Sequence, residues 1–224
     1  MSSSNNYFAA IVAREKTALL NLGSVRGYVI IKDAKRELEK TCPKIVSCAH
    51  ILAVVVRDAS TFVGGPSWTV KLGRRDSTTV SHALAETDFP GPFDPLGRLI
   101  SGFAKKGLST RDMVALSGAH SIGQAQCFLF RNKIYSNATD IDVGFASSRR
   151  RQCPRKDQNG NLAPLDLVTP NQLDNNYFKN LRQRIFFICS TLDKFLDVSS
   201  KEETYIGWRR YPVKSFFWIF PAKW

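Results

Sequence analysis

The chain has 224 residues, of which 43% are hydrophobic and 23% charged, a composition typical of globular proteins and not of disordered ones. Lysine and arginine number 32 against 19 aspartates and glutamates, a formal net charge of +13. This excess favours polyanions such as nucleic acid, acidic polysaccharide or an anionic membrane. The densest basic run, residues 149–151, lacks the interleaved aromatic residues that single-strand binders use for stacking, so we expect no nucleic-acid partner. No apolar run is long enough to predict a membrane span.

Apolar spacing predicts three helices before residue 108. Residues 28–40 place Ile31, Ala34 and Leu38 at helical spacing, residues 47–62 are more apolar and therefore central, and residues 96–107 form a further amphipathic helix. Residues 68–72 alternate for too short a distance to build a sheet. The segment SHALAETD, which contains His82, is expected to be a loop with a solvated histidine.

The segment LSGAHSIGQAQC, residues 116–127, contains a single histidine among small residues. Ser109 and Asp112 form a capping-box pattern that predicts a helix start at Thr110. On that helix, Leu116 and His120 would share the buried face, so His120 points inward.

Two interpretations of His120 follow from the spacing. It is either a hydrogen-bonded core histidine or a haem ligand, because haem iron needs only one protein ligand on its proximal face. The small residues Gly118, Ala119 and Ser121 would let a flat macrocycle approach. Spacing alone does not choose between the two.

The five cysteines, at positions 42, 48, 127, 153 and 189, contain no C-x-x-C pair, which favours disulfides over a zinc site. Their odd number leaves at least one thiol free or paired outside the chain. A glycosylation sequon at residues 137–139 would matter only after secretion. The N-terminal residues show no convincing signal peptide.

Six motifs in order resemble the secretory plant peroxidases, class III of the haem peroxidases. They read EKTALLNLGSVRG, CPKIVSCAHILA, GGPSWTVKLGRRDS, FPGPF, DMVALSGAHSIGQAQC and PLDLVTPNQLDNNYF. The resemblance implies a mainly α haem peroxidase fold over residues 15–200, with an unmatched segment 1–14 and a divergent basic aromatic tail 201–224.

The resemblance also assigns site residues. It makes His120 the proximal ligand of haem b, Pro90 part of the entrance for the aromatic donor, and Cys127 and Cys153 a disulfide pair. The implied calcium ligands are Ser121, Asp166, Thr169, the carbonyl of Gln172, and Asp174. Hard oxygen ligands suit calcium. The alternative for DLVTPNQLD, a proline turn with capping aspartates, stays open.

The distal half of the implied site differs from the family pattern. Family members carry an arginine and a His-Asp-Cys run upstream of the position of Glu15, and residues 1–14 contain neither histidine nor cysteine. Glu15 and Asn21, which support the distal histidine in the family, are present. We therefore expect an incomplete fold without the distal helices, and impaired turnover, because general acid–base catalysis is worth about 10²–10⁴ in rate.

Other family features are altered as well. His50 stands where the family has an aspartate that pairs with an arginine, here Arg74, so we expect either an unpaired buried arginine or a relaxed region. Cys42 and Cys48 lose their family partners, and Cys189 is an additional cysteine. Lys201 falls where the family places the aspartate that bonds the proximal histidine, with Asp197 or Glu202 as substitutes after a local shift.

The resulting expectation is an oxidoreductase that uses haem and hydrogen peroxide to oxidise phenolic donors. By family it would be a secreted monomer that removes peroxide. Two alternative hypotheses remain. In the first, the chain is a non-catalytic binder, either of haem or calcium or, through its cationic surface, of acidic cell-wall polysaccharide. In the second, the chain does not fold stably, because apolar surface is exposed.

Overall fold

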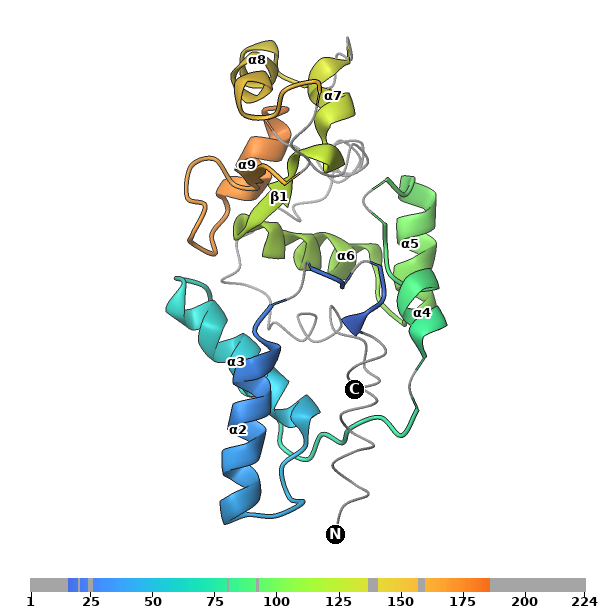
Figure 1. Cartoon of the computed structure of the whole chain (residues 1–224), viewed down its shortest axis with the longest axis vertical. Helices are drawn as coiled ribbons and strands as arrows, with labels where there is room; N and C mark the ends of the chain where they lie inside the picture. The colour runs from blue at the N-terminus through green and yellow to red at the C-terminus, as the bar shows by residue number, and fades with distance from the viewer. Residues whose placement is uncertain are drawn as a thin grey trace. The chain divides into compact units, whose positions relative to one another are not determined.

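The structure, a computed structural model, describes residues 16–19, 21–23, 26–79, 81–91, 93–136, 141–156 and 160–185. The chain divides into two compact units. Among the described residues, the first unit comprises those up to Ala59 together with residues 67–91, and the second comprises residues 60–66 and those from 93 onward. Figure 1 labels their α-helices and strand β1.

The first unit contains α2 (Tyr28–Thr41) and most of α3 (Cys48–Phe62), as the apolar spacing predicts. No residue of α2 is buried, and its predicted inward residues are only half-buried. In α3, Ile51 and Ala53 are buried. The Asp76 carboxylate caps the N-terminus of this helix by accepting hydrogen bonds from the backbone N–H groups of Cys48 and Ala49, at 3.1 and 2.8 Å.

The segment expected to be a loop forms a short helix, α4 (His82–Thr87), so that prediction is wrong. The Ser81 side chain caps it by accepting a hydrogen bond from Leu84 N–H at 3.1 Å, and Ala85 is its buried residue. A six-residue helix with one buried apolar side chain is too short to show helical periodicity in the sequence.

The second unit is built from helices and one small sheet. Its helices are α5 (Leu96–Lys105), α6 (Thr110–Ser117), α7 (Arg131–Tyr135), α8 (Val143–Gln152) and α9 (Asn176–Arg182). Two 3₁₀ turns, η1 (Gly118–Ser121) and η2 (Cys127–Leu129), follow α6. Strands β1 (Gln124–Gln126) and β2 (Leu162–Pro164) pair antiparallel, and β1 lies between α6 and α7 in Figure 1.

The apolar core of the second unit lies around β1, α7 and α8. Its largest fully buried side chains include Phe130 and Ile134, and Phe145 packs with them. The expected helices at 96–107 and from Thr110 are confirmed, whereas the small sheet escaped prediction because each strand has three residues. Helices dominate the described chain, which confirms the mainly α fold class.

Within the described ranges, no helix is both long and apolar enough to cross a membrane.

Candidate haem-ligand and calcium site

The helix before His120 begins as predicted. The Ser109 side chain accepts a hydrogen bond from Asp112 N–H at 3.2 Å, and the Asp112 carboxylate accepts one from Ser109 N–H at 2.8 Å, which completes the capping box. However, α6 ends at Ser117, and His120 lies in η1. The α-helical spacing used to predict an inward His120 therefore does not extend to this residue, because the chain changes from an α-helix to a 3₁₀ turn at Gly118.

His120 is nevertheless partly buried and contacts α9. Its Nδ1 lies 3.4 Å from the hydroxyl oxygen of Tyr177, and the two rings meet edge to face with centroids 5.7 Å apart. Burial lowers the pKa of His120, which favours the neutral imidazole that binds metals. Among the described residues, none makes a hydrogen bond to Nε2, so this nitrogen is the one open to a ligand.

Next to the histidine, Ser121 is fully buried and joins two distant segments. Its hydroxyl donates to the backbone carbonyl of Asp174 at 3.0 Å, across a sequence separation of 53 residues. This bond attaches η1 to the loop that precedes α9. Two of the predicted calcium ligands are thereby in direct contact.

Asp166 is the most buried acid of the described chain, with an exposed fraction of 0%. Its Oδ1 accepts hydrogen bonds from Val168 N–H at 2.8 Å, Thr169 N–H at 3.2 Å and the Asn180 amide at 3.1 Å. Its Oδ2 is buried with no hydrogen-bond partner. A buried carboxylate oxygen without a partner is costly, and a bound cation would compensate it.

Thr169 and Asp174 complete the cluster. The Thr169 hydroxyl donates to Asp174 Oδ2 at 2.7 Å, and the Asn176 amide donates to both, at 2.9 Å to the hydroxyl and 3.1 Å to the carboxylate. Gln172 closes the intervening turn, since its N–H donates to the Thr169 carbonyl at 3.0 Å. The structure therefore brings the predicted calcium residues into one loop cluster.

The donor set suits calcium better than a transition metal. It offers two carboxylates, hydroxyls and backbone carbonyls, which are the hard oxygen ligands of calcium. No group of three or more His, Cys, Asp or Glu side chains capable of holding one metal ion occurs in the part of the chain that the structure describes. Sequence reasoning missed Asn176 and Asn180, whose amides donate to Asp174 and Asp166, because no local pattern distinguishes them from polar surface residues.

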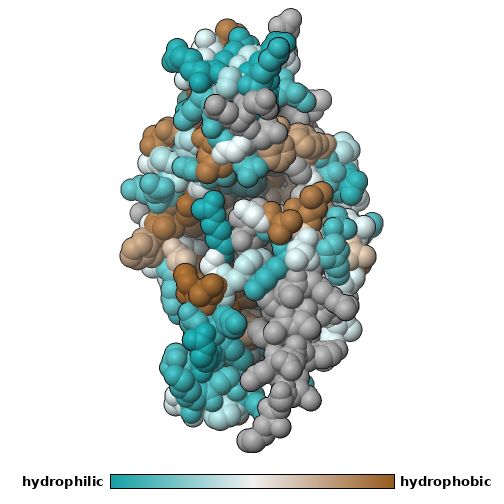
Figure 2. Space-filling model, viewed as in Figure 1, coloured by the Kyte–Doolittle hydropathy of each residue, from teal (hydrophilic) through white to brown (hydrophobic). Residues whose placement is uncertain are grey.

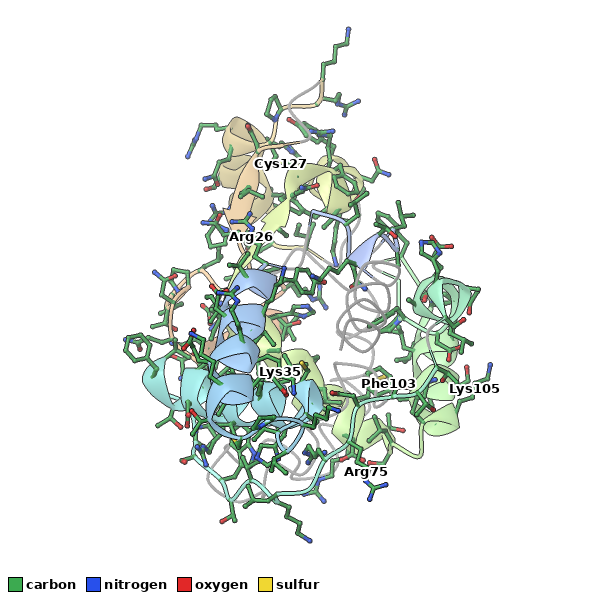
Figure 3. All side chains as sticks on the ribbon, turned by 60° about the horizontal axis from the view of Figure 1, so that its bottom comes forward. Arg26, Lys35, Arg75, Phe103, Lys105 and Cys127 are labelled. Carbon is green, nitrogen blue, oxygen red and sulfur yellow. A yellow bond between two sulfur atoms is a disulfide. The ribbon has the colours of Figure 1, made fainter. Side chains whose placement is uncertain are left out.

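The disulfide between Cys127 and Cys153 is present, with Cα atoms 5.5 Å apart. It joins η2 to the end of α8, and Cys127 is labelled in Figure 3. Both cysteines are fully buried in the apolar core around Phe130. Cys42 and Cys48 are free thiols, half-buried and buried respectively, and Cys189 lies outside the described residues.

The remaining predicted residues do not join this cluster. Asn21 is half-buried and Pro90 is exposed after α4, both in the first unit, which has no defined placement relative to His120. Glu15 lies outside the described residues, as do Asp197, Lys201 and Glu202.

Of the two alternatives expected for His50 and Arg74, the structure shows the relaxed region and not an unpaired buried arginine. His50 N–H donates to Ser47 Oγ at 3.0 Å, and Ser47 in turn donates to the Arg74 carbonyl at 2.6 Å. The Arg74 side chain is exposed, so the region holds no buried arginine at this position. Arg74 lines an open pocket of about 470 Å³ with Lys35 and Arg75, which Figure 3 labels.

Comparisons with known proteins agree with the motifs. The family profile described as peroxidase matches residues 8–207. The lignin-forming anionic peroxidase of Nicotiana sylvestris is 78% identical over 173 residues, which cover 77% of this chain and 54% of that protein. Peroxidase 5 of Arabidopsis thaliana is 60% identical over 174 residues, covering 77% of the chain and 54% of that protein.

A third relative, peroxidase 22.3 of Oryza sativa subsp. japonica, is 56% identical over 170 residues, covering 75% of the chain and 53% of that protein. The chain spans about half the length of the curated relatives it matches.

Proposed function

Because the chain belongs to the plant peroxidase family, class III, we propose that its second unit binds haem b through His120 and calcium through the adjacent loop cluster, in support of peroxide-dependent oxidation of phenolic donors. Bound haem would supply the redox chemistry toward peroxide. The observation that carries the proposal is the buried, unpartnered Oδ2 of Asp166, in the same cluster as Ser121, the residue next to His120.

In this proposal His120 presents Nε2 to the iron, and calcium holds the turn that carries it. Ser121 donates a hydrogen bond to the loop at Asp174. A cation held by Asp166 and Asp174 would therefore restrain the C-terminal end of η1, whereas α6 restrains its N-terminal end. Immobilising one ligand-bearing turn in this way orients the imidazole before haem binds. Calcium therefore acts on the haem site through Ser121, without contact with the reacting atoms.

For these 224 residues we further propose that the chain binds haem but turns over peroxide at a reduced rate. The other two histidines of the sequence are His50 and His82, and both lie in the first unit. His82 faces Glu86 on the same helix, with Nδ1 3.6 Å from Oε1, and His50 packs at the start of α3. The proposal therefore assigns neither histidine a distal acid–base role.

Haem titration of the full chain, refolded with calcium, tests the ligand. We expect a Soret band that is lost in His120→Ala and kept in the matched control His82→Ala, because the latter removes a histidine that pairs with Glu86 on α4. Peroxide-dependent phenol oxidation should be lower than that of a complete relative by about 10²-fold or more. A Soret band that survives in His120→Ala would reject the assigned ligand, and turnover equal to the relative would reject the impaired activity.

Calcium removal tests the cluster without haem. At a free calcium concentration about 100 times the Kd, binding should raise the free energy of unfolding by about 2.7 kcal/mol. We expect a chelator to abolish this gain, and Asp166→Asn to make unfolding insensitive to calcium. The exposed acid Asp33, paired with Arg36 on α2, gives the control Asp33→Asn, which should keep the calcium response. An Asp166→Asn chain that still responds to calcium would place the ion elsewhere.

A specific surface favours acidic polysaccharide as an additional partner. The exposed basic residues Arg150, Arg151, Arg155 and Lys156 follow one another around the end of α8. The guanidinium carbons of Arg150 and Arg155 lie 5.4 and 5.0 Å from the ring centre of Tyr135, so both cations lie against one aromatic ring. Hydrophilic side chains cover much of this end of the second unit in Figure 2.

Retention on immobilised polygalacturonate tests that partner. We expect elution at a lower salt concentration for Arg150→Gln with Arg155→Gln, because two cations are lost from one surface. The matched control is Lys105→Gln with Lys106→Gln at the end of α5, which removes the same charge and should elute close to the unsubstituted chain. If both double variants elute at the same lowered salt concentration, retention depends on net charge alone and not on the surface around Tyr135.

Secretion and a monomeric state are further proposals. A structural disulfide persists in oxidising compartments, and Cys127–Cys153 is buried in the core, so the chain fits an extracellular location. Sedimentation of the refolded chain would test the monomeric state, and a protein that precipitates even with haem and calcium would support the unstable alternative.

A further inference from the structure

Tyr177 is the residue of α9 that meets His120. Its side chain is 3% exposed, its ring packs edge to face against His120 at a centroid separation of 5.7 Å, and it contacts Phe178 in the same way at 5.3 Å. The hydroxyl oxygen lies 3.4 Å from His120 Nδ1. A buried tyrosine hydroxyl generally finds a hydrogen-bond partner, and this ring nitrogen is within reach.

The direction of this hydrogen bond decides which nitrogen of His120 can bind a metal. A neutral imidazole carries one proton, so a hydroxyl that donates to Nδ1 leaves the proton on Nε2 and blocks that nitrogen. A hydroxyl that accepts from Nδ1–H leaves the lone pair on Nε2 free. Only the second arrangement is compatible with an iron ligand.

We propose that the Tyr177 hydroxyl accepts a hydrogen bond from His120 Nδ1–H and so acts as a positioning residue that sets the tautomer and ring orientation of the haem ligand. This inference rests on the proposed function, since it assigns a partner to the same histidine. Within the described ranges, no carboxylate makes a hydrogen bond to His120, and Tyr177 is its side-chain partner. A neutral phenol accepts less strongly than a carboxylate, so it orients the ring while giving the imidazole less anionic character.

The two polar neighbours of Tyr177 on α9 explain why its hydroxyl is held in place. Asn176 donates to Thr169 and Asp174, and Asn180, one turn further along, donates to the buried Asp166. Tyr177 thus lies between two residues that are bonded to the calcium cluster. The position of its hydroxyl relative to His120 is therefore coupled to that cluster.

The tautomer can be measured in the haem-free full chain by ¹⁵N NMR of its histidine side chains. We expect Nδ1 of His120 to carry the proton in the unsubstituted chain, and the proton to shift toward Nε2 in Tyr177→Phe, which removes only the acceptor. Tyr135→Phe is the matched control, because it removes a tyrosine hydroxyl that likewise lies 3.4 Å from a polar atom, the Arg150 carbonyl oxygen, and makes no contact with His120. A proton on Nε2 in the unsubstituted chain, or no change in Tyr177→Phe, would overturn the proposal.

With haem bound, the same variants give a second measurement. Loss of an outer hydrogen bond to a ligand histidine typically weakens binding about 10–100-fold, so we expect Tyr177→Phe to bind haem about tenfold more weakly and to raise the iron reduction potential. If His120→Ala abolishes haem binding while Tyr177→Phe leaves the affinity and the potential unchanged, the tyrosine proposal fails and the proposed function stands. If the unsubstituted chain binds no haem, the proposed function fails, and the NMR measurement still decides the role of Tyr177.

Discussion

The two units differ in how far apart in sequence their interacting residues lie. In the second unit, the Ser121 hydroxyl reaches Asp174 across 53 residues, His120 meets Tyr177 across 57, and the disulfide joins residues 26 apart. On α2 of the first unit, the ion pairs join residues three or four positions apart, and the bond from Cys48 N–H to the Asp76 carboxylate at the start of α3 spans 28. Local pairs support a helix, whereas distant pairs fix one segment against another.

Burial follows the same division. The second unit encloses a cluster that contains Phe130, Ile134 and the disulfide, while no residue of α2 is buried and its Val29 and Ile30 are each 68% exposed. A site needs ligands from several segments held at fixed distances. The candidate site therefore lies in the unit whose described side-chain bonds span the larger sequence separations.

The largest expected contrast is between a fully buried apolar side chain of the second unit and a half-buried one of the first. Phe130→Ala should lower the free energy of unfolding by about 3–5 kcal/mol, because a fully buried ring leaves a cavity. Ile31→Ala on α2 should cost less than about 1.5 kcal/mol, because that side chain is only half-buried. Urea unfolding of both variants measures the difference, and equal losses would contradict the contrast in burial.

Next in size is the disulfide. Replacing Cys127 and Cys153 by serine should lower the free energy of unfolding by about 3–4 kcal/mol, since the unfolded chain regains the freedom of the closed loop. Cys42→Ser, at a half-buried free thiol, is the control and should change little. Thermal unfolding under oxidising conditions compares the two. A double variant as stable as the unsubstituted chain would show that the core around Phe130 holds the loop without the covalent link.

A smaller contrast lies in two serine caps, one in each unit. Ser109→Ala at α6 should cost about 1 kcal/mol, because it removes the hydroxyl that accepts from Asp112 N–H and donates to the Asp112 carboxylate. Ser81→Ala at α4 should cost about 0.5 kcal/mol, because the cap that it removes belongs to a helix of only six residues. Amide hydrogen exchange of each helix reports the loss locally. The reverse order would mean that α4 contributes more than its burial indicates.

The smallest effect concerns the free thiol of the first unit. Burial, and then the nearby Asp76 carboxylate, raise the pKa of Cys48 from 9.0 to about 11. The folded chain then keeps a proton that the unfolded chain releases, so this contribution to stability is full below pH 9.0 and is lost as pH rises toward about 11. The decline of the urea midpoint between about pH 8 and about pH 10 should be smaller in Cys48→Ala.

Alkylation provides an independent measurement on the same thiol. Iodoacetamide should modify the half-buried Cys42 before the buried Cys48 at neutral pH, because the thiolate is the reactive form. Denaturant should remove the difference. Equal rates in the folded chain would show that the start of α3 opens readily.

Parts of the fold and site were predictable because they depend on neighbouring residues. Helical spacing located α2, α3 and α5, and the Ser109–Asp112 pattern located the start of α6. Spacing was less reliable at His120, where a 3₁₀ turn replaces the helix after Ser117. The side chain still faces α9, because the turn brings it to Tyr177.

Other features could not be read from local patterns. The strands β1 and β2 have three residues each and exist through pairing with one another, and the short α4 is defined by its serine cap. The amides of Asn176 and Asn180 gained a role only when folding brought the DLVT segment against α9. Their sequence context alone is that of ordinary polar surface residues.

The sequence by itself determined the family and the mainly α class, because the ordered motifs and the helical spacing depend on residue identity and short-range order. The disulfide pair and the candidate ligands followed from the sequence only as what the family resemblance implies. Only the tertiary structure decided that Asp166 is buried with one oxygen lacking a partner, and that Tyr177 lies against His120. Burial and side-chain contact between residues 57 positions apart are properties of packing, which depends on how distant segments exclude water together.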